Sequence, residues 1–226
     1  MRNKILLLLT LFATELSSCQ NKFDINKIKN EDFKKLVELF KEANLPFSTY
    51  DEMYCPEVIE KSLVRKFICN EESCLKDWSG YEIEFGPCVY LPSNGDYVIL
   101  IYDESTDCGT IRKLITYDYY GNKISELEIF AEKTFHGDRK KNEVVYYEIQ
   151  SRINNKLIIE KKYFEIYADE WKENNTRYFS GRYVEFVYKI DEKGNISLIS
   201  EKDHGKKKYL GGRLESNVFP RWKVCQ

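Results

Sequence analysis

The order of apolar and polar residues divides the chain into a short helical part and a longer part with the pattern of β-strands. In residues 31–43 the apolar positions follow the spacing i, i+3, i+4, i+7, which predicts an amphipathic helix that ends before Pro46. A second helix is predicted from about residue 57 to 67, with Pro56 at its start. From residue 80 onward the period changes to two, which is typical of strands.

Turn signals separate these strands into successive hairpins. Gly121-Asn122, Asn154-Asn155 and the segment 192–195 can each form a tight connection between two strands. Successive hairpins favour antiparallel neighbours in a meander. The predicted strands are 81–85, 97–103, 111–120, 123–130, 143–153, 156–167, 182–191 and 196–201.

The predicted fold class is therefore mainly β (α+β), an antiparallel meander of about eight or nine strands with one or two N-terminal helices. Hairpin spacing leaves open whether the sheet closes into a barrel, folds into a sandwich or stays a curved sheet. The longest stretches without a strand pattern, 168–181 and 202–217, are rich in charge and glycine, and we expect them to be exposed loops.

The first nineteen residues have the order of an export signal. A basic start at 1–4 precedes the apolar run 5–14, which as a helix would cover about 15 Å, half of a hydrocarbon core of roughly 30 Å. This run is too short to span a bilayer and suits the central region of a secretory signal. Leu16-Ser17-Ser18-Cys19 follows it and resembles the lipobox of bacterial lipoproteins.

That resemblance implies a lipid anchor. In such proteins the sulfur of the cysteine, here Cys19, receives a diacylglycerol, the signal is cut before it and the new amino terminus is acylated. The resulting domain prediction is a removed signal (1–18), a lipidated cysteine with a tether (19–29), and a single β-rich domain (30–226) whose residues 30–68 are helical. The alternatives are an ordinary secretory signal with a chance cysteine, or a buried N-terminal helix.

The residue after the cysteine bears on location. Gln20, rather than Asp, implies outer-membrane sorting in lipoproteins of double-membrane bacteria. We therefore expect the protein in the bacterial cell envelope, anchored by lipid to the outer membrane and facing the periplasm.

Six cysteines remain after Cys19, and an even number in an exported chain indicates disulfides. Six cysteines allow 15 pairings, among which the sequence does not choose. A competing zinc interpretation would use the Cys69-x4-Cys74 pair, but no second short pair or nearby histidine completes it. The candidates are Cys55, Cys69, Cys74, Cys88, Cys108 and Cys225.

Charge and motifs give little support to a specific chemistry. The net charge of −2, from 35 basic and 37 acidic residues, offers no reason to expect nucleic acid as a partner. The chain contains no nucleophile elbow, zinc-protease helix or phosphate-binding loop, so we expect no cofactor. His136 and His204 each lie beside an aspartate and are weak candidates for a general base.

Several acidic and basic groups have an ordinary structural interpretation beside a functional one. The pairs Glu82/Glu84 and Glu126/Glu128 could serve glycoside hydrolysis or simply form the wet face of a sheet. The acidic run 103–107 could bind calcium or be a plain loop. The basic clusters Arg139-Lys140-Lys141 and Lys206–Lys208 with Lys202 and Arg213 could lie on anionic headgroups or a glycan, or be solvated loop tips.

Aromatic residues are unusually frequent, with 17 Tyr, 13 Phe and 3 Trp. They favour sheet packing, and some of them could form a recognition surface for a sugar or a protein. We therefore expect a non-enzymatic binding module, held to the membrane through Cys19, with a protein or glycan partner. An envelope hydrolase acting on glycans or peptides and a periplasmic inhibitor or immunity-type protein are the alternatives.

Overall fold

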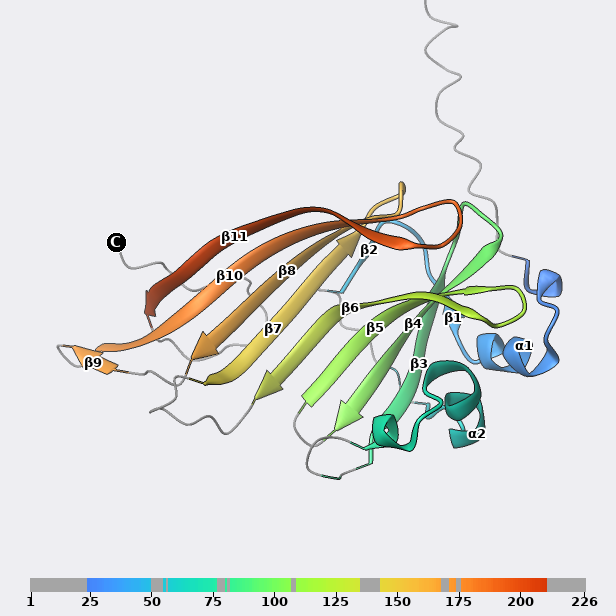
Figure 1. Ribbon diagram of the computed structural model, residues 1–226, viewed down its shortest axis with the longest axis horizontal. Coiled ribbons are helices and arrows are strands. Elements are labelled where there is room, and N and C mark those ends of the chain that lie inside the picture. The colour runs from blue at the N-terminus through green and yellow to red at the C-terminus, as the bar shows by residue number, and fades with distance from the viewer. Residues whose placement is uncertain are drawn as a thin grey trace, which may run out of the picture.

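A computed structural model of the chain describes residues 24–49, 55, 57–76, 80, 82–106, 109–134, 143–167, 171–173 and 176–210. It is mainly β with short helices near the N-terminus, which confirms the predicted fold class. Three short strands join the sheet: β1 (Lys41–Glu42), β2 (Phe47–Ser48) and β9 (Trp171–Glu173). The eight long strands (Figure 1) are β3 (Glu84–Leu91), β4 (Tyr97–Thr106), β5 (Gly109–Asp118), β6 (Lys123–Thr134), β7 (Val144–Ile153), β8 (Ile158–Tyr167), β10 (Thr176–Ile190) and β11 (Ile196–Leu210).

All these strands belong to one open, curved sheet. Each long strand pairs antiparallel with the next, from β3 to β11, and β1 adds a parallel edge beside β3. In the described residues the two ends of this path do not pair, so the barrel alternative is wrong. This sequential order of strands confirms the meander prediction. The prediction was possible because each hairpin carries its own local turn signal.

The sheet divides between β6 and β7. Only residues 131–134 of β6 pair with β7, whereas β2 pairs with β7 at Ile153 and Arg152. The two parts of the sheet, β3 to β6 and β7 to β10, contribute to one hydrophobic core. This core includes Ile99, Leu114, Ile129, Ile159 and Ile190, all fully buried.

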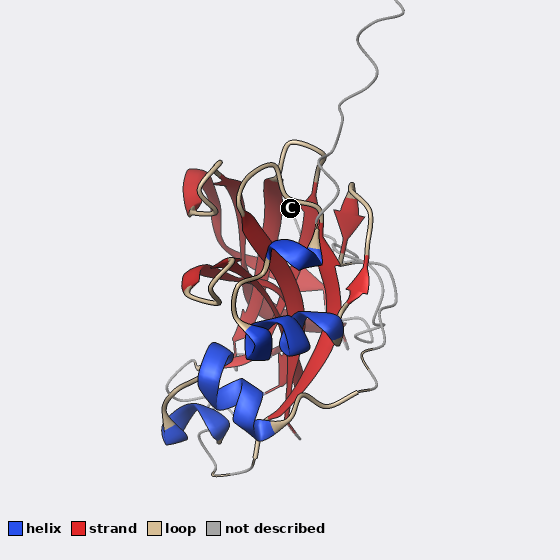
Figure 2. Ribbon diagram, turned by 90° about the vertical axis from the view of Figure 1, so that its right-hand side faces the viewer, coloured by secondary structure: helices blue, strands red, loops and turns tan. Residues whose placement is uncertain are grey.

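The helices build a second core on the other face of β4 and β5. They gather at one end of the sheet (Figures 1 and 2), where Phe33, Leu36 and Val37 of α1 (Glu31–Glu38) lie fully buried against Ile115 and Tyr117. Each such side chain contributes about 1.5–3 kcal/mol on burial. No helix among the described residues has the length and apolar character needed to cross a membrane.

Both predicted helices are shorter than expected. Asn30 caps α1 by accepting hydrogen bonds from Asp32 N and Phe33 N, as its type predicts, but the helix ends at Glu38. The chain then turns into β1, whose backbone groups pair with β3 instead of extending the helix.

The second helix is present as one continuous run over residues 61–68, and only its predicted start is missing. Residues 57–60 stay outside it because Ile59 N donates to Phe85 O. The helical elements of this part, besides the initial 3₁₀ turn η1 (Ile25–Lys27), are α2 (Lys61–Leu63), the π turn η2 (Val64–Ile68) and the 3₁₀ turn η3 (Glu72–Leu75).

The predicted loops 168–181 and 202–217 are wrong where the structure describes them. Residues 176–181 and 202–210 continue β10 and β11, which pair from Tyr178 with Leu210 to Ile190 with Ile196. The prediction took the high charge of these segments as a sign of a loop. In the described residues β11 pairs only with β10, so it is an edge strand, and edge strands often carry lysines. The strand predicted at 81–85 is also wrong in extent, because β3 begins at Glu84.

Two hairpins use the same turn. The segments 118–122 and 191–195 both read Asp-x-x-Gly-Asn, and in each the aspartate accepts hydrogen bonds from backbone amides two and four residues later. Gly121 and Gly194 have φ of 87° and 86°, a region that favours glycine. This shared turn fixes the β5–β6 and β10–β11 registers.

Candidate functional site

A disulfide joins the segment between β2 and α2 to strand β3 of the sheet. Cys55 and Cys88 are bonded, with a Cα–Cα distance of 5.0 Å, and Cys69 is also in a disulfide. The zinc interpretation of Cys69 is therefore not supported, since a bonded sulfur is no thiolate ligand. The side chain of Cys74, and all of Cys19, Cys108 and Cys225, lie outside the described residues.

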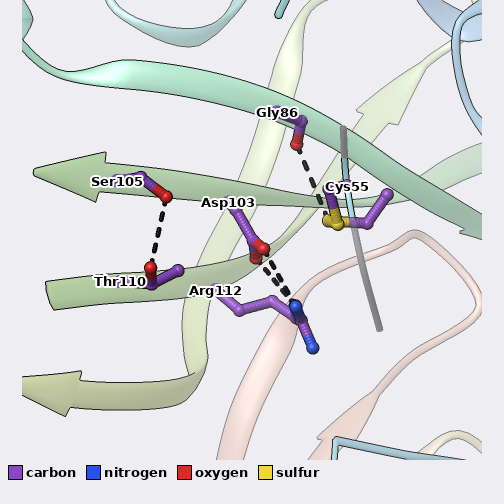
Figure 3. Close-up of a disulfide and its surroundings, with 7 residues drawn as sticks. Cys55, Gly86, Asp103, Ser105, Thr110 and Arg112 are labelled. Carbon is purple, nitrogen blue, oxygen red and sulfur yellow. Dashed lines mark hydrogen bonds and ion pairs between the residues drawn. A yellow bond between two sulfur atoms is a disulfide. The ribbon is translucent and has the colours of Figure 1, made fainter. Parts of the chain in front are cut away.

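Beside this disulfide lies a buried ion pair (Figure 3). Arg112 donates from Nε and Nη2 to the two carboxylate oxygens of Asp103, at 2.7 and 2.9 Å, and the two side chains are only 5% and 11% exposed. Because Asp103 lies within β4, the acidic run 103–107 is no loop there, and its neighbour Glu104 points to the opposite face. Asp103 and Glu104 thus do not gather their carboxylates for calcium, and Asp107 lies outside the described residues.

The described residues contain one group with the spacing of metal ligands. Cys55, Cys88 and Asp103 offer atoms within 4.8 Å of one another. The sulfurs are bonded to each other and the carboxylate is bound by Arg112, so this group does not fit a metal ion as it stands.

A second polar group lies on one face of β8, β10 and β11. In the register Glu165 is opposite Arg182, and Tyr163 is opposite Val184, which is opposite Asp203, so their side chains share a face. We call the set Tyr163, Glu165, Tyr167, Arg182 and Asp203 the Glu165 cluster.

Glu165 is the centre of this cluster. Its residue is only 7% exposed, and its carboxylate accepts hydrogen bonds from Tyr163 (2.6 Å) and Tyr167. Burial, with this hydrogen bond and the negative charge of Glu165, raises the pKa of Tyr167 to about 12, and the same causes raise the pKa of Tyr163. Both phenols therefore stay protonated donors at neutral pH.

Two cations lie at the exposed side of Glu165: Arg182 of the cluster and the neighbouring Lys206. Arg182 donates to Asp203 from Nη2 at 2.8 Å and from Nε at 3.1 Å, and lies 3.9 Å from Glu165. The Lys206 ammonium lies over the Tyr167 ring, 4.0 Å from its centroid. Half-exposed tyrosines and an arginine thus surround a buried carboxylate, an arrangement held rigid by its own hydrogen bonds.

A buried lysine lies further along the same face. Lys161 is 9% exposed, and burial lowers its pKa, with Glu128 acting in the opposite direction. It is opposite Ser151, whose Oγ is buried and makes no hydrogen bond in the described part of the chain. Because Ser151 is fully buried, the pair is closed to solvent and does not form a nucleophilic site here.

The opposite face carries the candidate histidine. His204 lies at a register shift between β10 and β11, where its Nε2 is 3.0 Å from Glu185 and its ring is 4.9 Å from that of Tyr183. Tyr183 OH also donates to Glu185 at 2.9 Å. Hydrogen bonds from His204 and Tyr183 lower the pKa of Glu185. We call Tyr183, Glu185 and His204 the His204 cluster; His136 lies outside the described residues.

In each of the two carboxylate pairs, one member is held by lysine. Glu82 precedes β3 and pairs with Lys61, while Glu84 is exposed. Glu126 pairs with Lys113 and Lys123, and these charges, against the effect of burial, lower its pKa. These ion pairs favour the ordinary interpretation as charged surface residues.

The basic and aromatic candidates are divided between described and other residues. Lys202 and Lys206–Lys208 belong to β11, not to a loop. Of the three tryptophans in the chain, Trp171 belongs to β9. The residues Trp78, Trp222, Arg139, Lys140, Lys141 and Arg213 lie outside the described part.

The sequence analysis missed the repeated Tyr-x-Glu pattern. Tyrosine and glutamate two residues apart on a strand share a face, and in four strands the phenol donates to the carboxylate. The four pairs are Tyr102/Glu104, Tyr146/Glu148, Tyr163/Glu165 and Tyr183/Glu185. Period two in the sequence could have revealed them.

Comparison with known proteins gives no relative. No family model, no curated protein and no solved structure matches this chain.

Proposed function

We propose that the protein is a lipid-anchored bacterial envelope protein that binds a protein or glycan partner through the Glu165 cluster and has no catalytic activity. The anchor is proposed from the lipobox-like Leu16-Ser17-Ser18-Cys19, and the location at the outer membrane facing the periplasm is proposed from Gln20, which follows it.

The observation that carries the binding proposal is that the Glu165 carboxylate is buried and accepts hydrogen bonds from two tyrosines. A buried carboxylate is retained against its desolvation only with partners, and here Tyr163 and Tyr167 supply them. The result is a rigid surface of aromatic rings beside Arg182, whose side chain is 40% exposed. Tyrosine and arginine are the side chains most often found at the centres of binding surfaces.

The same state argues against catalysis at this cluster. A general base needs a lone pair directed at a substrate, and the carboxylate oxygens of Glu165 already accept from two phenols. Arg182 is likewise engaged by Asp203. Such groups orient a ligand better than they transfer protons.

The anchor is tested first. In bacterial cells the wild-type chain should incorporate labelled palmitate, float with membranes and show an acylated N-terminal mass, and Cys19→Ala should lose all three. A native chain with an unmodified start would overturn the anchor proposal.

Binding is tested with the cluster's exposed side chains. Tyr167→Ala with Arg182→Ala should weaken binding to a glycan array or to a cross-linked envelope partner by tenfold or more, since each such anchor contributes about 1 kcal/mol or more. Lys189→Ala, an exposed residue of the same strand, is the matched control. Equal binding by both variants would contradict the proposal.

The His204 cluster favours a second candidate, the envelope hydrolase. A histidine 3.0 Å from a carboxylate has the geometry of an oriented general base. If the protein hydrolyses glycans or peptides, His204→Gln should abolish turnover while Lys202→Gln, on the same strand, leaves it intact. Equal turnover by His204→Gln and wild type would exclude this role.

A further inference from the structure

The described chain begins at one end of the sheet. Lys29 N donates to Tyr119 O at 2.8 Å and Asn30 Nδ2 donates to Tyr120 O at 3.2 Å, which hold the first residues against the β5–β6 turn. Lys27 lies 3.9 Å from Asp96 of the β3–β4 turn. Segment 24–30 is therefore fixed to two hairpin ends.

A third hairpin end lies beside these two. Gly95 packs so closely against the β10–β11 turn that an added Cβ would lie 2.3 Å from Glu192 O, and Thr116 of β5 donates to Gly194 O at 2.7 Å. Figure 1 shows these turns and the first helical turn on the same side of the molecule. We call segments 24–30, 92–96, 118–122 and 191–195 the tether end.

We propose that the tether end rests on the headgroup layer of the bilayer that holds the protein's own lipid anchor, with Tyr120 at the interface. The inference rests on the anchor proposed above at Cys19. Asp24 follows Cys19 by five positions, and a chain spans at most about 3.3–3.6 Å per residue. Asp24 therefore lies within about 18 Å of the lipid-bearing cysteine.

Tyr120 has the side chain and the exposure that this position requires. It is 64% exposed at the tip of the β5–β6 turn, where its backbone is fixed by Asp118 and Asn30. A tyrosine presents an apolar ring and a polar hydroxyl, which suits the boundary between headgroups and hydrocarbon.

Charge does not drive this contact. Three exposed lysines are matched by three exposed acids, so attraction to anionic lipids is not the cause. The chain length and Tyr120 carry the orientation instead. The exposed charges of the tether end are Lys27, Lys29 and Lys193, and Asp24, Asp96 and Glu192.

The test uses the lipid-modified full chain in vesicles that contain a phospholipid with a photoreactive diazirine in its headgroup. Cross-linked peptides are identified by mass spectrometry. They should come from the tether end and be absent from 176–182 and 203–210. Tyr120→Ser should lower the yield by about threefold while the protein still floats with the vesicles. Val58→Ser removes an equally exposed residue (63%) away from this end and should change nothing.

The outcomes separate the two proposals. Cross-links at 203–210 as frequent as at the tether end, in protein that floats, would overturn the orientation and leave the anchor standing. Equal yields from Tyr120→Ser and wild type would overturn the role of Tyr120. Protein that neither floats nor carries an acyl group would end the anchor proposal, and the orientation with it.

Discussion

Breaking the buried pair between Asp103 and Arg112 should be among the most destabilising single changes in the chain. Arg112→Met removes both hydrogen bonds to Asp103 and leaves its carboxylate, 11% exposed, without its partner. Removing one member of a buried ion pair costs about 3–5 kcal/mol. The contact of the guanidinium with the Phe130 ring, 5.2 Å from its centroid, is lost as well and adds about 0.5–2 kcal/mol.

The assay is guanidinium chloride unfolding under non-reducing conditions, read as the free energy of unfolding. Lys61→Met breaks the exposed pair of Lys61 with Glu82, whose side chains are 66% and 67% exposed, and should leave the free energy of unfolding nearly unchanged. Asp103→Leu with Arg112→Met removes both charges and should recover most of the loss. A loss under about 1 kcal/mol for Arg112→Met, or no recovery in the double variant, would refute the reasoning.

Three further changes test the packing, the disulfide and a buried charge. Cys88→Ser opens the Cys55–Cys88 bridge, which closes a separation of 33 residues, and should lower the free energy of unfolding by about 3–4 kcal/mol. Reductant should cause no further loss of stability in this variant through the Cys55–Cys88 bond, because the variant lacks it. Gly121→Ala should cost at least about 1 kcal/mol more than Gly205→Ala: both have positive φ, but only the first Cβ meets side chains, at 2.9 Å, so equal losses would contradict the packing. Lys161→Met should stabilise the protein at neutral pH, whereas Lys162→Met on the other face should not. Burial lowers the pKa of Lys161 in the folded state, so between that lowered pKa and the ordinary value of about 10.4 the unfolded state binds more protons than the folded state. The free energy of unfolding of the wild type should therefore rise as the pH rises toward about 10.4. The difference in stability between Lys161→Met and the wild type should become smaller over the same range.

The hairpins were predictable because their signals are local. Gly121 and Gly194 each sit in a short turn that determines its own backbone, and the flanking strands alternate with period two. The length of β10 and β11 was not predictable in this way. Residues 202–208 are charged, and only pairing with β10 over 15 residues makes them a strand. The end of α1 was predicted wrongly for a related reason. The chain leaves the helix so that Lys41 can pair with Val89, which lies in a strand almost fifty residues away.

The site depended even more on register. His204 was recognisable as a candidate, but its partner Glu185 is set by a register shift near Gly205, which no local pattern shows. The burial of Glu165 follows from the fold, not from its neighbours in sequence. Its phenol partners, however, lie two residues to either side, so the Tyr-x-Glu-x-Tyr pattern was visible in the chain itself.

The two proposals together give the long hairpin β10–β11 a reason for its length. The turn at 191–195 belongs to the tether end, and Arg182 lies eight residues before Ile190 on β10. At about 3.3 Å per residue, the strand carries the Glu165 cluster roughly 26 Å from that turn. A tether of five residues allows the body of the protein little height above the bilayer, so a ligand site near the turn would be crowded by headgroups. Placing the cluster toward the far part of the hairpin gives a partner in the periplasm access to it while the anchor stays short.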